Sequence, residues 1–415
     1  MVAAPSLDAE QRRVVEHEGG PLLVLAGPGT GKTTTLVEAI VDRIEGRGAD
    51  PESVLALTFS RKAAEQLRDR VSARLGRTTS STLCATFHSF AYGLVRRFSP
   101  PELYAEPLRL LSAAEQDVVL QQLLTDAPES VRWPDGFRGA VGTRGFAREV
   151  HDTLARARER GLDPAGLRAV GERSGHPELV AAGWFLEQYH EVLDAEGALD
   201  YADLIRRAAR VADDHRDELR RRYQHVFVDE YQDTDPSQVE LLRVLAGDGR
   251  NLVVVGDPDQ SIYGFRGAEV RGILDFPAVF PRADGAPAPV VPLRTTRRFG
   301  ARMAAATSRI ASAIAVSGSI DADTFRAFRS PWPDPQAPSG RVEVHTHDTA
   351  RAESEHIGDL LRRAHLEDDV PWSRMAVLVR SGRSTIPPLR RALVAAGVPV
   401  EVAADDTPLV REPSL

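Results

Sequence analysis

The chain has very little cysteine and lysine, and it has no long hydrophobic run. One cysteine among 415 residues, Cys84, excludes an internal disulfide and fits a reducing cytoplasm. No apolar stretch approaches the roughly 20 residues of a membrane-spanning helix, and the N-terminal MVAAPSLDAEQ does not resemble a secretory signal. We therefore expect a cytoplasmic protein with no membrane partner, in which Cys84 is a buried strand residue.

Lysine is scarce because arginine replaces it nearly everywhere. Lys32 and Lys62 are the only lysines, although Lys and Arg together number 52. This bias is typical of a GC-rich genome, and it suggests that both retained positions need a compact ammonium group. The net charge of −8 argues mildly against a nucleic-acid binder, but a local basic groove is enough for binding.

Apolar runs alternate with helical patterns, which predicts an α/β fold with a parallel sheet. Continuous apolar segments predict buried strands at Leu22–Ala26 and Val54–Thr58, and two later strands end near Asp229 and Asp257. Between these pairs, about residues 100–197 have a mostly helical pattern, which predicts an inserted helical segment.

The C-terminal part begins after two stretches rich in proline, glycine and alanine. Residues 281–289 predict a boundary or long loop, and residues 330–340 predict a linker. The pattern that follows predicts the opening of a second α/β unit, with strands at RVEVHT and MAVLVR and helices at 352–364 and 386–396. His345 in the first of these strands and His347 just after it are interpreted as surface strand residues, because no cysteine or carboxylate set has ligand spacing.

The segment GPGTGKT matches the P-loop pattern G-x-x-x-x-G-K-[ST] and lies between a predicted strand and a predicted helix. Its backbone N–H groups are expected to hold the phosphates of ATP, with Lys32 reaching the β- and γ-phosphates and Thr33 ligating Mg²⁺. The flanking strand and helix argue against a glycine-rich turn that binds nothing. The predicted nucleotide-binding residues of this segment are Gly27, Pro28, Gly29, Thr30, Gly31, Lys32, Thr33 and Thr34.

A second acidic strand end complements the P-loop. Val226, Phe227 and Val228 lead into Asp229 and Glu230. Asp229 is expected to hold Mg²⁺, and Glu230 to orient or deprotonate the attacking water. Alone, these two residues are more typical of a solvated acidic turn, because Asp-Glu after three apolar residues is common.

The wider strings resemble a known family. LDAEQ, GPGTGKT, LTFSRKAAEQ, ATFHSF, VDEYQDTDPSQ and GDPDQSIYGFRGA are similar, in this order, to motifs of the UvrD/Rep/PcrA group of superfamily 1 DNA helicases. RecB-like and actinobacterial AdnAB-type helicase–nuclease subunits share these motifs. Arg61 stands where the family usually has asparagine, and Phe265 where tryptophan is usual.

The resemblance implies further nucleotide contacts. Gln11 is implied to read adenine, Gln260 to sense the γ-phosphate, and Arg298 to sense phosphate. The family's next motif has a tyrosine that stacks on adenine. Here Arg297 replaces it, and a guanidinium plane can also stack on a base.

The resemblance also implies contacts with single-stranded DNA, which is held by aromatic stacking and by phosphate contacts. Phe59, Tyr263 and Phe265 are candidates for stacking, with core packing as the alternative for Phe59 and Phe265. Gln260 precedes Tyr263 by three residues, so one loop is placed to touch both ATP and DNA. The candidates for backbone contact are Thr86, His88 and Arg266.

By this resemblance, residues 1–99 and 198–288 form a RecA-like motor domain with a P-loop NTPase core, and residues 100–197 are an accessory helical insertion. Residues 289–415 begin a second RecA-like domain that is incomplete, because the family's later motifs do not follow. The implied function is that of an ATP-dependent 3′–5′ helicase or translocase on single-stranded DNA, in repair or recombination. The alternative is a DNA-binding scaffold subunit without motor activity. The implied partners are single-stranded and duplex DNA and a second helicase–nuclease subunit.

Overall fold

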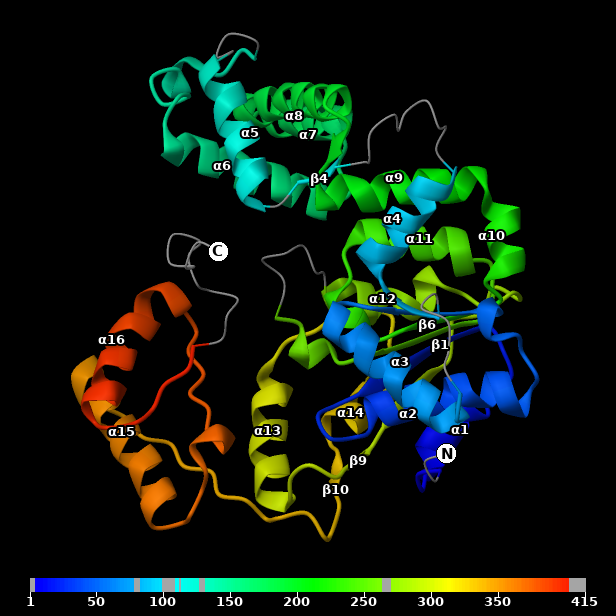
Figure 1. Cartoon of the computed structure of the whole chain (residues 1–415), viewed down its shortest axis with the longest axis vertical. Coiled ribbons are helices and arrows are strands. Elements are labelled where there is room, and N and C mark those ends of the chain that lie inside the picture. Colours follow the sequence, from blue (N-terminus) through cyan, green and yellow to red (C-terminus); the bar gives the residue numbers. More distant parts are fainter. Residues whose placement is uncertain are drawn as a thin grey trace. The chain divides into compact units, whose positions relative to one another are not determined.

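A six-stranded parallel sheet forms the core of the first compact unit of the computed structural model, which describes residues 4–77, 83–98, 109–111, 113–126, 131–262 and 270–402 (Figure 1). Its strand order is β3-β2-β6-β7-β1-β8, so β1 lies between β7 and the edge strand β8. The strands are β1 (Pro21–Ala26), β2 (Val54–Thr58), β3 (Cys84–Thr86), β6 (His225–Val228), β7 (Leu252–Gly256) and β8 (Val290–Leu293).

Helices cover both faces of this sheet, which explains why its strands are continuous apolar runs. Along β1, Leu22 and Val24 belong to one hydrophobic cluster, whereas Leu23 and Leu25 belong to the other, because successive side chains point to opposite faces. The first cluster includes residues of α1 (Ala9–Val15), α2 (Lys32–Val41) and α3 (Arg61–Leu75). Cys84 lies in the same cluster, as predicted, and burial raises the pKa of its thiol to about 12.

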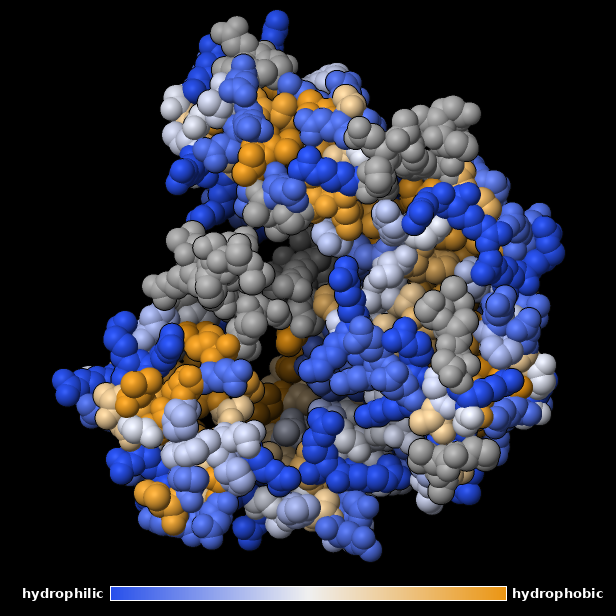
Figure 2. All heavy atoms as spheres, in the orientation of Figure 1, coloured by the Kyte–Doolittle hydropathy of each residue, from blue (hydrophilic) through white to orange (hydrophobic). Residues whose placement is uncertain are grey.

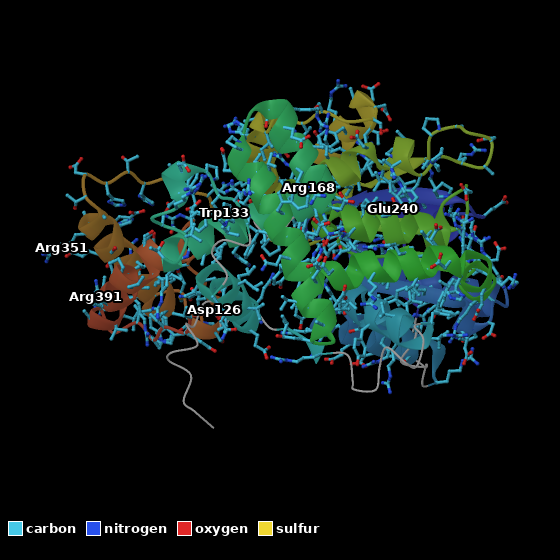
Figure 3. The ribbon with its side chains drawn as sticks, turned by 90° about the horizontal axis from the view of Figure 1, so that it is seen from above. Asp126, Trp133, Arg168, Glu240, Arg351 and Arg391 are labelled. Atoms are coloured by element: carbon cyan, nitrogen blue, oxygen red, sulfur yellow. The ribbon has the colours of Figure 1, made fainter. Side chains whose placement is uncertain are left out.

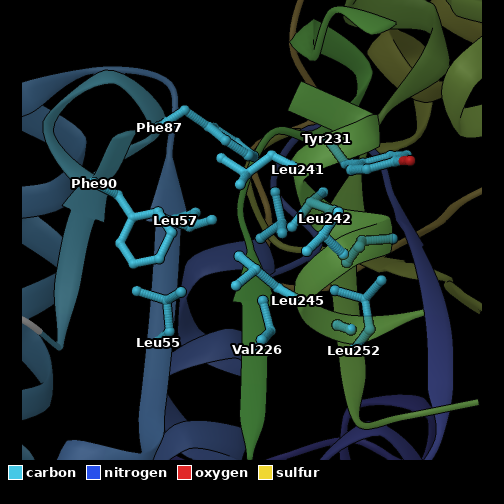
Figure 4. Close-up of a cluster of buried hydrophobic side chains, with 14 of the residues drawn as sticks. Leu55, Leu57, Phe87, Phe90, Val226, Tyr231, Leu241, Leu242, Leu245 and Leu252 are labelled. Carbon is cyan, nitrogen blue, oxygen red and sulfur yellow. The ribbon is translucent and has the colours of Figure 1, made fainter. Parts of the chain in front are cut away.

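The opposite face packs against a second set of helices, and Figure 4 shows part of this core. Leu55 and Leu57 of β2 face Phe90 of α4 (Phe87–Phe98), while Leu241 and Leu245 cover β6 and β7. The helices of this face are α4 (Phe87–Phe98), α9 (Tyr201–Asp214), α10 (Arg216–Arg222), α11 (Pro236–Ala246) and α12 (Val270–Val279).

The predicted helical insertion has a hydrophobic core of its own. Trp133, labelled in Figure 3, belongs to this core. Its ring packs edge-on against Phe146 at 4.9 Å between centroids, and Phe185 lies beside the same indole. Pro164 and Pro177 each occupy the first turn of a helix, where the missing N–H costs nothing. The elements are β4 (Arg109–Leu110), α5 (Ala113–Asp126), α6 (Arg144–Glu159), α7 (Pro164–Ser174), α8 (Pro177–Ala195) and β5 (Ala198–Leu199), with β4 and β5 paired in parallel.

A buried ion pair joins this insertion to the sheet domain. Arg158 at the end of α6 donates from Nη1 to Asp200 Oδ2 at 2.6 Å, and both side chains are almost fully buried. Asp200 also caps α9 by accepting the Asp203 N–H at 2.8 Å, and it accepts from Tyr189 and Gln116. One carboxylate therefore connects helices of the insertion to the first core helix that follows it.

Residues beyond 288 continue the first sheet. β8 pairs with β1, and the first compact unit extends to Arg341, whereas the predicted division into motor domains at residue 288 stays a prediction. The remaining elements of this unit are α13 (Ala301–Ala313), α14 (Ala322–Arg329) and a parallel pair of short strands, β9 (Thr295–Thr296) and β10 (Trp332–Pro333).

The second compact unit begins at Val342 and contains α15 (Ala350–Leu366) and α16 (Gly382–Ala395). Both predicted helices are therefore present, but the predicted strands at RVEVHT and MAVLVR are wrong, since the described residues there form no strand. A strand needs a paired neighbour to satisfy its backbone groups, and Val344 and Leu378 are instead about nine-tenths exposed. Figure 2 shows apolar side chains on the surface of this unit.

Short turns complete the described secondary structure. A π turn, η1 (Asp42–Gly46), extends α2, and two 3-10 turns follow the strands that bear the acidic residues. The 3-10 turns are η2 (Pro51–Ser53), η4 (Asp135–Phe137), η5 (Tyr231–Asp233), η6 (Pro258–Gln260) and η8 (Trp372–Arg374).

Candidate nucleotide-binding site

The candidate residues gather at the carboxyl edge of the parallel sheet, where α/β proteins bind their ligands. The P-loop follows β1, Asp229 follows β6, and Asp257 follows β7. Phe59 follows β2, which pairs with β3 so that Thr58 lies opposite Thr86. The sheet order thus brings segments that are far apart in sequence to one edge.

Two glycines of the P-loop allow its backbone to turn tightly. Gly29 has φ of 78° and Gly31 has φ of 88°, in the left-handed region that favours glycine. A Cβ on Gly31 would lie 2.5 Å from Gln11 Nε2, and one on Gly29 would lie 2.8 Å from Thr296 Oγ1. The Thr30 hydroxyl donates to the Gly27 carbonyl at 2.8 Å and closes the loop. Helix α2 starts at Lys32, so its first N–H groups border the loop.

Lys32 is directed at the acidic residues of the neighbouring strand ends. Its Nζ lies 3.0 Å from Oε2 of Glu230, with 14% of the lysine side chain and 37% of the glutamate side chain exposed. Glu230 has φ of 51°, which is unusual for a residue with a side chain. This strained backbone holds the carboxylate opposite the P-loop lysine, as a functional position often does.

The carboxylates near Lys32 outnumber this one cation. Burial, reinforced by the charge of Glu230, raises the pKa of Asp229 to about 6, although Lys32 opposes the shift. The same two causes raise the pKa of Asp233 to about 6, and burial raises the pKa of Asp257. A site with this excess of buried negative charge is suited to a divalent cation.

Mg²⁺ fits this donor set. No group of three or more His, Cys, Asp or Glu residues within the described ranges is arranged to hold a metal alone. Mg²⁺ commonly takes only one or two protein ligands and completes its shell with phosphates and water. The predicted ligands, the Thr33 hydroxyl and the buried Asp229 carboxylate, come from adjacent parts of this edge.

Gln232 is a site residue that we did not single out from the sequence. Its Nε2 donates to Glu230 Oε2 at 2.9 Å, and its Oε1 accepts the Asp257 N–H at 2.9 Å, so it links the ends of β6 and β7. Gln260 in turn donates to Asp257 Oδ2. The string VDEYQDTDPSQ contains Gln232, but only the sheet order reveals its partner 25 residues away.

The predicted adenine contacts meet on the other side of the P-loop. Gln11 donates from Nε2 to the Thr30 carbonyl at 3.1 Å, and its Oε1 accepts the Asp8 N–H. Arg297 forms an ion pair with Asp8 at 2.9 Å, and its N–H donates to the Gly29 carbonyl. The structure brings Gln11, Arg297 and the P-loop together, and their roles toward adenine stay predictions.

Arg298, the predicted phosphate-sensing residue, follows Arg297 in the same strand end. Its N and Cβ border the position that a Cβ on Gly29 would occupy, and its side chain is exposed. The P-loop therefore packs closely against residues 296–298, which come from nearly 270 residues further along the chain.

The predicted DNA contacts divide into two groups. Thr86 is buried and accepts the Ser89 N–H at 3.1 Å, and His88 packs edge-on against Tyr201 at 5.2 Å. Phe59 is half-buried at the end of β2. These three lie at the same edge as the P-loop. Tyr263, Phe265 and Arg266 lie outside the described residues.

A separate cleft of about 1150 Å³ lies between the insertion and helices α9 and α11. Asp163, Glu187 and Asp194 line it from one side, and Glu240 of α11, labelled in Figure 3, lines it from the other. Carboxylates outnumber arginines there, so the cleft is poorly suited to a DNA backbone. The P-loop edge remains the candidate site.

The parallel sheet, the P-loop and the acidic strand ends define a P-loop NTPase with a RecA-like core. Comparison with known proteins agrees, because residues 7–281 match the family model of the UvrD/REP helicase N-terminal domain. The chain belongs to the UvrD/Rep helicase family.

Named relatives support this assignment. The chain is 31% identical over 411 residues to the ATP-dependent DNA helicase UvrD1 of Mycobacterium tuberculosis (strain ATCC 25618 / H37Rv), covering 95% of this chain and 49% of the relative. It is 31% identical over 283 residues to the ATP-dependent DNA helicase PcrA of Staphylococcus aureus (strain NCTC 8325 / PS 47), covering 67% and 37%. The chain therefore spans about half the length, or less, of these curated relatives. Within its described part, no helix is long and apolar enough to cross a bilayer.

Proposed function

We propose that this chain carries the ATP-binding motor part of an ATP-dependent DNA helicase. The observation that carries the proposal is the contact of Lys32 with Glu230, 198 residues apart in sequence, at a strand edge that also holds buried Asp229. A P-loop lysine, a cation-binding aspartate and a glutamate for the attacking water are the parts that phosphoryl transfer to water requires. Relatives named ATP-dependent DNA helicases give further support.

Each residue then has a distinct task. The backbone of Gly27–Thr33 binds the phosphates, and Lys32 compensates their charge. Thr33 and Asp229 are the residues to hold Mg²⁺, which stabilises charge on the phosphates when it is bound. Glu230 orients the attacking water or accepts its proton. Gln260 senses the γ-phosphate, and Arg298 contacts phosphate.

The remaining residues contact the adenine base of ATP and the single-stranded DNA. Gln11 reads adenine, and the guanidinium of Arg297, held by Asp8 at 2.9 Å, offers a flat surface for stacking. Phe59, Thr86 and His88 contact single-stranded DNA at the ends of β2 and β3. We further propose movement in the 3′ to 5′ direction, unwinding of duplex DNA, a cytoplasmic role in repair or recombination, and association with a second helicase–nuclease subunit.

DNA-stimulated ATP hydrolysis tests the proposal most directly. Glu230→Gln should lower the DNA-stimulated kcat on the order of 100-fold or more, because the amide cannot accept a proton. Lys32→Ala should lower it comparably, because the phosphate charge loses its partner. Glu240→Gln is the matched control, since Glu240 is exposed on α11 and pairs with its helix neighbour Arg243 at 3.4 Å.

Stopped-flow translocation on single strands labelled at one end tests the direction. A signal that depends on ATP and reports arrival at the 5′ end supports the proposal, whereas arrival at the 3′ end overturns the polarity. DNA binding without ATP-dependent movement in either direction, by the chain together with any further domains, would indicate the scaffold alternative.

A further inference from the structure

Arg329, the last residue of α14, is bound to the turn that carries Gln260. Its Nε donates to Asp259 Oδ2 at 2.9 Å, and its Nη2 donates to Asp259 Oδ1 at 2.5 Å, so the two side chains pair through both carboxylate oxygens. Its Nη1 donates to the Ile314 carbonyl at 2.9 Å. The side chains are only 10% and 16% exposed. Such a two-pronged, partly buried pair is far more directional than an exposed ion pair.

The same helix is anchored beside the P-loop. Phe328, the residue before Arg329, is buried in the hydrophobic core with Leu23 and Leu25 of β1. A Cβ on Gly27 would lie 3.9 Å from the Phe328 ring, which is ordinary contact distance. Helix α14 also packs against β8. Arg329 therefore extends from an element that is fixed to the strand preceding the P-loop.

Short-range hydrogen bonds hold the turn at Asp259. The 3-10 turn η6 contains only Pro258–Gln260, and it is closed by the Gln260 N–H donating to the Asp257 carbonyl at 3.0 Å. Asp257 Oδ1 accepts the Asp259 N–H at 2.9 Å, and Ser261 donates to the Gln232 carbonyl. Arg329 is thus a second anchor of this turn, at Asp259, in addition to Gln232 at Asp257 and Ser261.

We infer that Arg329 is a positioning residue, whose paired contact with Asp259 fixes the 257–260 turn relative to the P-loop so that Gln260 can distinguish ATP from ADP. The inference rests on the proposed function, because that function assigns the γ-phosphate to Gln260. Arginine suits this task, since its planar guanidinium contacts two carboxylate oxygens and a carbonyl at once. Lysine would offer only one point of charge.

Titration calorimetry of the 415-residue chain with ATPγS and with ADP, both with Mg²⁺, tests the inference. Arg329→Gln should weaken ATPγS binding about tenfold and leave ADP binding within twofold, because only the contact of Gln260 with the third phosphate is lost. Gln260→Ala should reproduce this selective loss, and Arg329→Lys should lie between wild type and Arg329→Gln. Equal losses for both nucleotides, or no loss for either, would overturn the inference.

Two controls separate positioning from folding and from the proposed function. Arg326→Gln removes an exposed arginine of the same helix that pairs with Asp323, and it should change neither affinity. If Arg329→Gln unfolds, the double variant Asp259→Asn with Arg329→Gln replaces the ion pair by a neutral pair and should show the same selective loss. If Gln260→Ala changes nothing, the inference fails, while loss of hydrolysis in Lys32→Ala still upholds the proposed function.

Discussion

At the scale of single residues, Asp229 shows how a strand end prepares a carboxylate for a cation. It is buried at the end of β6, and its neighbour Glu230 carries the same charge, so both surroundings favour the protonated form. Lys32 offsets this only in part, because its ammonium group is already paired with Glu230. A bound cation would therefore relieve the electrostatic repulsion between Asp229 and Glu230.

This repulsion predicts how stability depends on pH. The native pKa of Asp229, about 6, lies above the unfolded value near 3.9, so between these pH values the native state retains a proton that the unfolded state has lost. Stability should therefore fall as pH rises through this window, by about 2–3 kcal/mol for this residue. Asp229→Asn should lack this pH-dependent loss of stability. Urea unfolding of the wild-type chain and of Asp229→Asn at pH 4.5 and pH 7, without nucleotide, measures the difference.

Asp321 serves as a control, because its effect on stability should depend on pH in the opposite direction. Hydrogen bonds from the Thr324 backbone and side chain lower the pKa of Asp321, which caps α14. Replacing Asp321 by Asn should therefore cost more stability at pH 7 than at low pH. A pH dependence that is identical in wild type and Asp229→Asn would contradict the assignment to Asp229.

At the scale of elements, the sequence predicts best what depends on neighbours in the chain. The runs that form β1 and β2 are apolar throughout because helices cover both faces of the sheet, and the P-loop pattern specifies a strand, a loop and a helix together. Features that depend on distant partners were not predicted. Strand β8 is one, since VVPL at the end of the sheet contains Pro292. The roles of Gln232 and Arg329 are others, because their partners lie 25 and 70 residues away. RVEVHT and MAVLVR show the converse, since a strand pattern without a paired neighbour does not make a strand.

The start of α2 offers a test of why the P-loop needs glycine. Gly31 precedes the helix with φ of 88°, and a Cβ would meet the buried Gln11 amide at 2.5 Å. Gly31→Ala should therefore cost more than the roughly 1 kcal/mol typical of a left-handed alanine, and should weaken ATP binding about tenfold or more. Thermal unfolding and nucleotide titration measure the two effects.

Gly48 provides the matched comparison. It also has a positive φ, 71°, but a Cβ there meets nothing within 4 Å. Gly48→Ala should show only the backbone cost and normal nucleotide binding. Adding Gln11→Ala to Gly31→Ala should recover part of the lost stability if the close approach is the cause. An equal loss in the two glycine variants would show that it is not.

At the scale of the whole molecule, the described residues of the first compact unit form three separate hydrophobic clusters. Two of them lie on the opposite faces of the sheet, and the third fills the helical insertion. Arg158 and Asp200 lie where the insertion meets the sheet domain, and the buried Arg158 Nε and Nη2 atoms have no hydrogen-bond partner among the described residues. Asp200 is the largest source of compensation for the guanidinium charge, and Asp203 and Tyr189 contribute further.

Removing one member of this pair should leave a buried, uncompensated charge. Arg158→Ala should lower the free energy of unfolding by about 3–5 kcal/mol, measured by urea denaturation. Arg160→Ala, two residues away and exposed, should change it by no more than about 0.5 kcal/mol. A cost below about 1 kcal/mol for Arg158→Ala would show that the connection is weaker than its burial indicates.

The strand order has a consequence for signalling between the two proposed binding regions. Four steps separate β1 from β3 in the sheet, and at about 4.8 Å per step the P-loop lies about 19 Å from the end of β3. That is more than twice the screening length of about 8 Å at physiological ionic strength. The two regions are too far apart for direct contact, so the loops that follow β6 and β7, which lie between them in the sheet order, are the expected route from nucleotide state to the predicted DNA contacts.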